Sequence, residues 1–236
     1  MRTPTERRAA PDAKGASARL SQVDRAYEEL RRRILDNEMP AGFQITEQDL
    51  AAQLDVSRTP AREAMLRLAN EGLVEIWPRH GMRVKPLSAD DMQEIYQILT
   101  ALESAAAGLA AARRPAPPEV KEMKRCIAKM DAALARDDLT GWARADERFH
   151  RLLTEASGNQ RLVALVDTCF GQSHRMRMLT LQMRPRPSTS NRDHESVLQA
   201  ILDGDAEGAA RIHREHREKS GKMLLDLLSR YGLSQL

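Results

Sequence analysis

Aromatic residues are scarce in this chain of 236 residues. Phe, Trp and Tyr together make up 3% of the sequence, although hydrophobic residues make up 42%. A core must therefore be built from Leu, Ala, Ile, Val and Met. This favours helices over a large sheet, because strands are enriched in aromatic and β-branched residues. The composition predicts a mainly α-helical protein, and the length suits two domains.

Cysteines and long apolar runs are also nearly absent. Cys126 and Cys169 are the only two cysteines and lack CxxC spacing, which suits a reducing cytosol. No apolar run approaches the ~20 residues of a membrane span. The N-terminus is charged and has no apolar signal-peptide segment. We therefore expect a cytoplasmic protein without a membrane partner.

The chain carries no strong charge of either sign. There are 37 Lys and Arg residues against 34 Asp and Glu residues, for a net charge of +3. Residues 1–86 hold 15 basic and 13 acidic residues, so the two halves do not differ. Bulk charge therefore does not identify a nucleic-acid-binding part, and only the local arrangement of charges can.

The segment from Thr46 to Gly72 predicts two short helices around a tight turn. Thr46 is a good N-cap for the first helix, with Asp49 three residues later. We expect Thr59 to cap the second helix and Pro60 to occupy its first position, where the missing N–H costs nothing. Gly72 is suited to end that helix.

The second helix of this segment has one apolar and one basic face. Arg58 and Arg62 are four residues apart, on a different face from the apolar residues. This is the pattern of a helix-turn-helix. The apolar positions recur at three- and four-residue steps and are expected to face a core: Ala61, Ala64, Met65 and Leu68.

Two short extended runs follow, at 73–77 and 82–86, with Pro78-Arg79-His80-Gly81 between them. They predict a hairpin whose tip carries His80, with Gly81 permitting a close backbone approach. Together with a helix expected from Ser21 to Asn37, they predict a DNA-binding winged helix-turn-helix over residues 21–86. Residues 1–20 lack periodicity and are expected to form a disordered tail.

From Ser88 onward the pattern is helical throughout. Short, turn-rich connections separate the helices, so residues 87–236 predict an antiparallel six-helix bundle. The expected helices cover residues 88–112, 119–136, 138–156, 160–183, 191–202 and about 206–230.

One carboxylate and several histidines of the bundle suit a metal site. Asp146 and His150 are four residues apart and share a helix face, while His194 and His216 lie in later helices. Such groups bind divalent transition metals such as Zn²⁺, Ni²⁺ or Mn²⁺. The spacing leaves two rival ligands open: His174 and His213.

These motifs resemble a known family. The run VSRTPAREAMLRLANEGLV at 56–74, followed by RHGMRV at 79–84, closely resembles the winged helix of GntR-family transcription regulators. The bundle resembles the FCD domain of the FadR subgroup in LESAAAGLAA at 102–111, DERFHRLLTEASGN at 146–159 and HESVLQAILDGDAEGAARIHREH at 194–216. The resemblance covers roughly residues 21–225.

The resemblance implies roles for the winged helix. Arg58, Thr59 and Arg62 match the positions that contact bases and phosphates, and His80 and Gly81 match the wing tip that enters the minor groove. Family members often carry an arginine early in the first helix of the motif. That position is Gln48 here, so we expect a weaker or altered DNA contact there.

For the bundle, the resemblance implies that Asp146, His150, His194 and His216 bind the metal, which selects His216 over His213. The metal-binding branch of the family uses its metal to hold a small carboxylate effector. Many members place an arginine just before the Leu-Glu pair, but residues 98–101 contain none. The carboxylate is therefore expected to meet the metal alone or one of three other arginines: Arg144, Arg175 or Arg177.

The resulting hypothesis is a homodimeric, metal-containing, ligand-responsive transcription regulator, a repressor that binds a palindromic operator. A metal-dependent enzyme using the Asp/His₃ site is an alternative. Against it, the sequence has no HExxH motif and no general base stands out near the ligands. In a third hypothesis the chain binds DNA, and its bundle is a metal-free dimerisation module.

Overall fold

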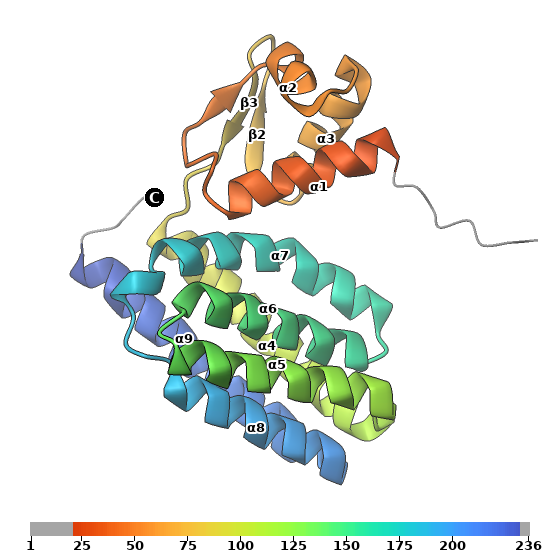
Figure 1. The fold of residues 1–236 in the computed structure, drawn as a ribbon, viewed down its shortest axis with the longest axis vertical. Coiled ribbons are helices and arrows are strands. Elements are labelled where there is room, and N and C mark those ends of the chain that lie inside the picture. Colours follow the sequence, from red (N-terminus) through yellow and green to blue (C-terminus); the bar gives the residue numbers. More distant parts are fainter. Residues whose placement is uncertain (1–20, 232–236) are drawn as a thin grey trace, which may run out of the picture.

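The structure, a computed structural model, describes residues 21–231 and shows a small winged domain above a helical bundle (Figure 1). The tail expected at residues 1–20 lies outside the described residues. The predicted mainly α-helical fold is confirmed. The elements are α1 (Gln22–Leu35), β1 (Gln44–Ile45), α2 (Glu47–Leu54), α3 (Arg58–Asn70), β2 (Val74–Trp77), β3 (Gly81–Val84), α4 (Ala89–Arg113), α5 (Pro117–Ala135), α6 (Leu139–Ala156), α7 (Gln160–Leu179), the 3₁₀ turn η1 (Leu181–Met183), α8 (Ser188–Asp203) and α9 (Ala206–Arg230).

The helix-turn-helix forms as predicted except at the start of its second helix. Thr46 caps α2 by accepting a hydrogen bond from the Asp49 N–H. Helix α3, however, begins at Arg58 after Ser57, so Thr59 does not cap it and Pro60 is its third residue. A proline is tolerated there because the first N–H groups of any helix lack an intrahelical acceptor.

The wing belongs to a three-stranded antiparallel sheet in the order β1-β3-β2. Strand β1 was not predicted, because two residues are too few to show an alternating pattern. Gly81, at the start of β3, has a φ of +87°, and a Cβ added to it would lie 2.1 Å from the Ile45 carbonyl oxygen. The close backbone approach at Gly81 is therefore made to β1, inside the protein.

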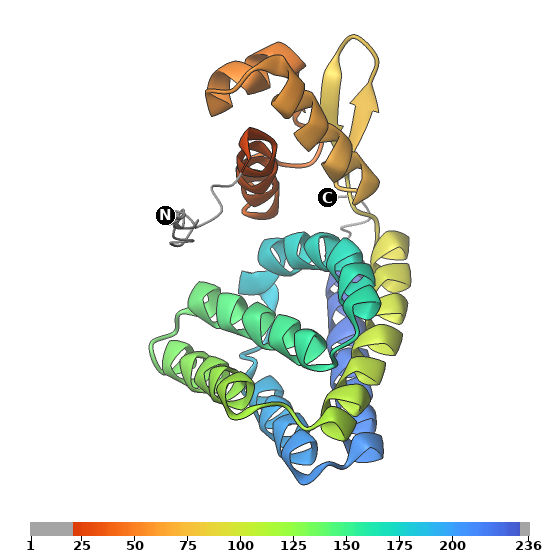
Figure 2. The same ribbon diagram turned by 90° about the vertical axis from the view of Figure 1, so that its right-hand side faces the viewer.

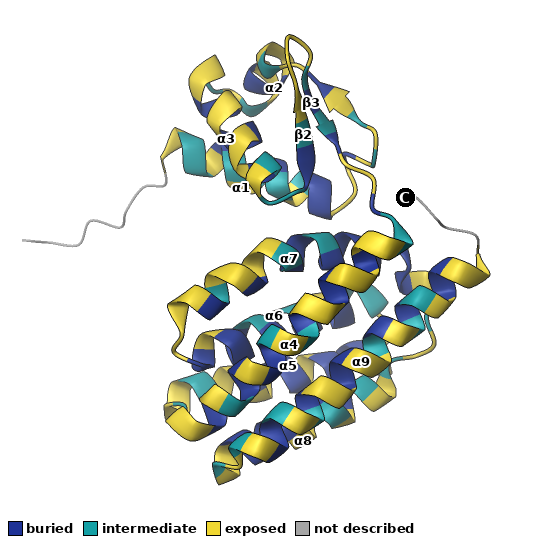
Figure 3. Ribbon diagram, turned by 180° about the vertical axis from the view of Figure 1, so that it is seen from behind, coloured by how far each residue is buried: buried dark blue, intermediate teal, exposed yellow. Residues whose placement is uncertain are grey.

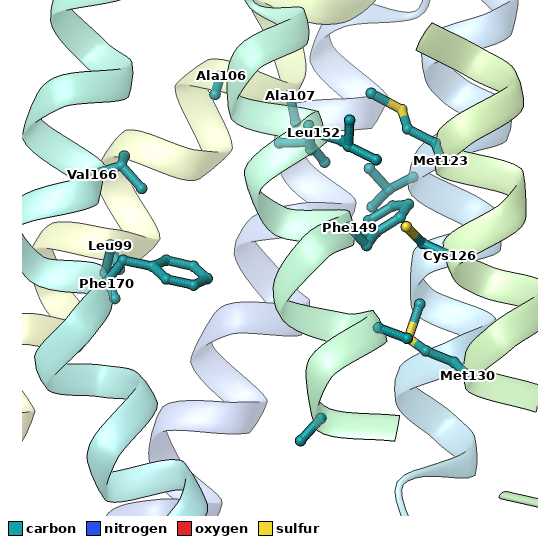
Figure 4. Close-up of a cluster of buried hydrophobic side chains, with 14 of the residues drawn as sticks. Leu99, Ala106, Ala107, Met123, Cys126, Met130, Phe149, Leu152, Val166 and Phe170 are labelled. Carbon is teal, nitrogen blue, oxygen red and sulfur yellow. The ribbon is translucent and has the colours of Figure 1, made fainter. Parts of the chain in front are cut away.

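The bundle has its own hydrophobic core, separate from that of the winged domain. Helix α4 packs along α9, and α5 packs on α6 (Figure 2). Figure 4 shows Phe149 of α6 fully buried beside Met123, Cys126 and Met130 of α5. Methionine fills irregular core space well, which suits a chain with few aromatic residues.

Helix α4 is the one described helix long and apolar enough to cross a membrane by length and composition. Half of its most apolar window is buried inside the bundle. Figure 3 shows α4 with one buried and one exposed face. It is thus placed as a core helix of the bundle.

Helix α7 connects the bundle to the winged domain. It lies against α1 at the top of the bundle (Figure 1). Gln172 Nε2 donates to the Glu71 carbonyl at 2.9 Å, and Arg175 Nη1 donates to the Lys85 carbonyl at 3.0 Å. Glu71 precedes β2 and Lys85 follows β3, so α7 holds both ends of the wing hairpin.

The structural role of Gly81 predicts an unequal response to two glycine substitutions. Gly81→Ala should destabilise the winged domain by more than about 3 kcal/mol, because it adds a clash with Ile45 to the strain of a positive φ. Gly42→Ala should cost only about 1 kcal/mol, since its φ is +79° but no atom lies within 4 Å of the added Cβ. Urea unfolding followed by tryptophan fluorescence measures both losses. In a Trp142→Phe background the signal comes from Trp77 of the winged domain alone. Equal losses in the two variants would contradict this role.

Candidate metal centre and DNA interface

Four of the five predicted DNA-contacting residues are exposed on the winged domain, and Gly81 is half-buried. Arg58 and Arg62 of α3 have side chains 71% and 67% exposed, and each is 3.7 Å from Glu47. Exposed ion pairs of this kind contribute little, so both guanidinium groups are available to a ligand. Thr59 and His80 are also exposed. A groove between α3 and the wing is lined by Arg58, Arg62, Gln48, Arg79 and Gly81.

The four predicted metal ligands converge in the bundle from three helices. Asp146 and His150 come from α6, His194 from α8 and His216 from α9, and each is at most 4% exposed. Asp146 Oδ1 lies 3.7 Å from His150 Nε2 and 3.5 Å from His194 Nε2. One ring nitrogen from each of the three histidines lies within 4.8 Å of the other two. We call these four residues the histidine cluster.

A fully buried carboxylate, Glu103 of α4, organises the side chains behind the cluster. Its Oε2 lies 2.8 Å from His150 Nδ1 and 2.9 Å from His213 Nε2. His213 is therefore turned toward Glu103, while His150 presents Nε2 to the cluster. His174 lies elsewhere, 2.7 Å from Glu147. The geometry thus groups His216, and not His174, with the other three residues, while His213 forms a second candidate group with Glu103 and His150.

Burial sets the protonation states of these groups. It lowers the pKa of His213 to about 4, and it also lowers the pKa values of His194 and His216. Burial alone would raise the pKa of Glu103, but Arg217 and the two neighbouring histidines outweigh it and hold that pKa well below its usual range. At neutral pH the site therefore combines neutral imidazoles at His194, His213 and His216 with an ionised carboxylate at Glu103.

The donor set fits a divalent transition metal. Three imidazole nitrogens and one carboxylate are the groups that Zn²⁺, Ni²⁺ and Mn²⁺ accept. Partners behind the ligands orient two rings: Glu103 contacts His150, and Asp193 Oδ2 lies 3.4 Å from His216 Nδ1. Carboxylates in such positions fix the tautomer that a metal requires.

A cavity of about 240 Å³ opens beside the histidine cluster, and we call it the bundle cavity. Arg177 lines it, but its Nη1 donates to Asp146 Oδ2 at 2.6 Å. Arg144 is exposed outside it, and Arg175 bonds to Lys85, so the structure does not bring these two to the cluster. The cavity is lined by Tyr96, Asp146, His150, Arg184, His216 and Arg217, among others.

Sequence reasoning missed Glu103, Tyr96 and Arg217. A signal for Glu103 existed, because it continues a buried stripe at helical spacing with Ala106, Ala107 and Ala110. A charged residue in such a stripe requires buried partners. Arg217 is four residues after His213 and shares its helix face, but the sequence does not show that this face meets α4.

Comparisons with known proteins agree with this architecture. Residues 22–84 match the bacterial regulatory proteins of the gntR family, and residues 94–219 match the FCD domain. The chain is 47% identical over 134 residues to an uncharacterized HTH-type transcriptional regulator of Agrobacterium vitis, covering 56% of this chain and 78% of that protein. It is 25% identical over 193 residues to the HTH-type transcriptional repressor RspR of Escherichia coli, covering 82% and 84%.

Among solved structures, E. coli McbR/YncC has the same fold. Its TM-score is 0.77 at 20% identity, and the match covers 90% of this chain and all of that one. The matching families and relatives are transcription regulators and not enzymes. They confirm the predicted resemblance and decide against the metal-enzyme alternative.

The buried imidazoles predict a loss of stability in mild acid. The pKa of His213 is about 4 in the folded protein and 6.5 in the unfolded chain. Below pH 6.5 the unfolded chain therefore binds a proton that the folded protein does not, and the free energy of unfolding falls as the pH drops. With chelator present, His213 alone should cost the bundle about 2 kcal/mol between pH 7 and pH 5. The lowered pKa of Glu103 affects the free energy of unfolding only below its ordinary pKa of 4.5, which lies outside this pH range.

Urea unfolding at both pH values, followed through Trp142 in a Trp77→Phe background, measures this loss. His213→Gln should remove about 2 kcal/mol of it, whereas His80→Gln on the exposed wing should change nothing. A bundle whose stability is the same at pH 5 and pH 7 would contradict the assignment.

Proposed function

Because the chain belongs to the GntR family of bacterial regulators and carries an FCD domain, we propose that it is a metal-containing, ligand-responsive repressor. It binds a palindromic operator as a homodimer and senses a small carboxylate in the bundle cavity. The observation that carries the proposal is the convergence of Asp146, His150, His194 and His216, of which Asp146, His150 and His216 line that cavity.

In this proposal the histidine cluster holds a divalent transition metal. The ion supplies a positive charge that attracts the carboxylate of the effector. Asp146 and the three histidines would be its ligands, while Glu103 and Asp193 keep His150 and His216 in the required tautomers. The alternative, a metal-free dimerisation module, does not account for four buried metal-binding side chains around one point.

The winged domain reads the operator. Arg58 and Arg62 are suited to guanine edges in the major groove, and Thr59 to the DNA backbone. Two winged helices related by dimer symmetry would read the two halves of a palindrome. We propose repression, and not activation, because the chain is similar to RspR, which is named a repressor.

Helix α7 is suited to connect effector binding with DNA binding. On one side Arg177 contacts Asp146 of the histidine cluster, and on the other Gln172 and Arg175 hold the ends of the wing hairpin. An effector changes DNA affinity only if it binds the two arrangements of the winged helices unequally. A shift at Arg177 would move α7 and thus favour one arrangement.

Arg58→Ala tests the DNA-reading face. Operator affinity should fall at least about tenfold and base preference should relax, because a bidentate contact to a base is worth about 1–3 kcal/mol. Arg67→Ala is the matched control, since Arg67 lies on the same helix but pairs with Asp24 at 2.8 Å. Fluorescence anisotropy with operator and scrambled DNA measures both. Wild-type affinity and selectivity in Arg58→Ala would reject this face.

Elemental analysis of protein purified without added metal tests the metal centre. We expect about one divalent transition ion per chain in the wild type, and a loss of most of it in His150→Ala. His174→Ala should retain the ion, because His174 pairs with Glu147 away from the cluster. A metal-free wild type that also fails to bind Ni²⁺ or Zn²⁺ in titration would support the dimerisation module instead.

A further inference from the structure

Arg217 and Tyr96, which line the bundle cavity, have unmet hydrogen-bonding capacity, as does Arg177 at its Nε. Arg217 of α9 is 2% exposed, and its Nε and Nη2 have no hydrogen-bond partner within residues 21–231. Tyr96 of α4 is 4% exposed, and its hydroxyl also lacks a partner within that range. Buried polar groups are normally paired with protein, water or ligand, so two such groups in one cavity indicate a binding site.

The packing of α9 on α4 holds these two groups together. The Arg217 guanidinium carbon lies 5.0 Å from the centre of the Tyr96 ring, within the range of a cation–π contact. Gly221, one turn further along α9, provides the space for the ring, since a Cβ there would lie 2.9 Å from Tyr96 Cδ1. Both side chains are therefore fixed in place without using their hydrogen bonds.

Glu103 is the ionic partner of Arg217 but leaves its donors free. Arg217 Nη2 lies 3.6 Å from Glu103 Oε1, which is longer than a hydrogen bond. The other oxygen of Glu103 contacts His150 and His213. This carboxylate thus lowers the cost of burying the Arg217 charge, while the N–H groups of Arg217 are left for another acceptor.

Each of the other arginines of the cavity already makes a hydrogen bond, although Arg177 Nε has no partner within residues 21–231. Arg177 donates to Asp146, Arg184 donates to the Thr180 hydroxyl, and Arg186 donates to Asp137. Within the described chain, Arg184 has no carboxylate partner. It adds positive charge to the same cavity. An anion is the ligand that this combination of free donors and excess positive charge favours.

We propose that Arg217 and the Tyr96 hydroxyl bind the carboxylate of the effector, at the side of the cavity next to the histidine cluster. The planar guanidinium can donate to both oxygens of a carboxylate, and the phenol supplies a further donor. This assignment rests on the proposed function and deepens it. In this assignment Arg217 and Tyr96 bind the carboxylate, a role that the sequence had given to Arg144, Arg175 or Arg177.

Calorimetric titration of the full chain, saturated with Ni²⁺, tests the assignment with acetate, L-lactate, succinate and citrate as probes. For the tightest-binding probe, Arg217→Met should weaken binding at least about tenfold, and Arg217→Lys less, because lysine keeps the charge but loses the planar fork. Tyr96→Phe should weaken binding about three- to tenfold while keeping the ring. Arg211→Met is the control and should bind as the wild type does, because Arg211 lies on the same helix as Arg217 but pairs with Glu215 at the surface, outside the cavity.

Nickel content and thermal unfolding are measured for every variant. If Arg217→Met loses the metal or fails to fold, Tyr96→Phe decides, because it removes only the hydroxyl. Wild-type binding in both Arg217→Met and Tyr96→Phe would overturn this subsite and leave the proposed function standing. If the wild-type protein binds nickel but none of the four acids, carboxylate sensing itself fails, and the subsite fails with it.

Discussion

The contact between Glu103 and His150 is the constraint on which the bundle site depends. A carboxylate with no exposed surface is costly unless charges and hydrogen bonds surround it. Glu103 meets this requirement with His150 from α6 and with His213 and Arg217 from α9, so one side chain of α4 ties three helices together. The same contact turns the other nitrogen of His150 toward the histidine cluster. The Glu103 carboxylate therefore both holds the three helices together and orients His150 toward the histidine cluster.

The two domains differ in whether their charged side chains are exposed or buried. Arg58 and Arg62 are exposed and only loosely paired with Glu47, so water screens them and they cost the fold little. The charges of the bundle are buried, and each must be compensated locally. DNA can therefore approach exposed positive charges directly, whereas in our proposal the positive charge of the cavity is balanced by the bound effector. This contrast suits a protein that binds DNA at an exposed surface and an effector in a buried cavity.

Much of the fold could be predicted from the sequence, because helical periodicity and capping act over a few residues. The capping of α2 by Thr46 and the i, i+4 pair Asp146 and His150 are examples. Strand β1 was missed because its two residues show no pattern, and the start of α3 was misplaced because several positions there tolerate proline. The pairing of Tyr96 with Arg217 depends on how α4 meets α9, which no local rule encodes. Likewise, the orientation of His213 depends on Glu103 and not on its spacing from His216.

The contacts between α7 and the wing have a consequence for how such proteins diversify. Gln172 and Arg175 bond to the carbonyls of Glu71 and Lys85, groups that every amino acid provides. Substitution of Arg58 or Arg62 on the DNA-reading face therefore leaves these two hydrogen bonds intact. A bundle of this type can keep its sensing chemistry while the winged domain acquires a new target sequence.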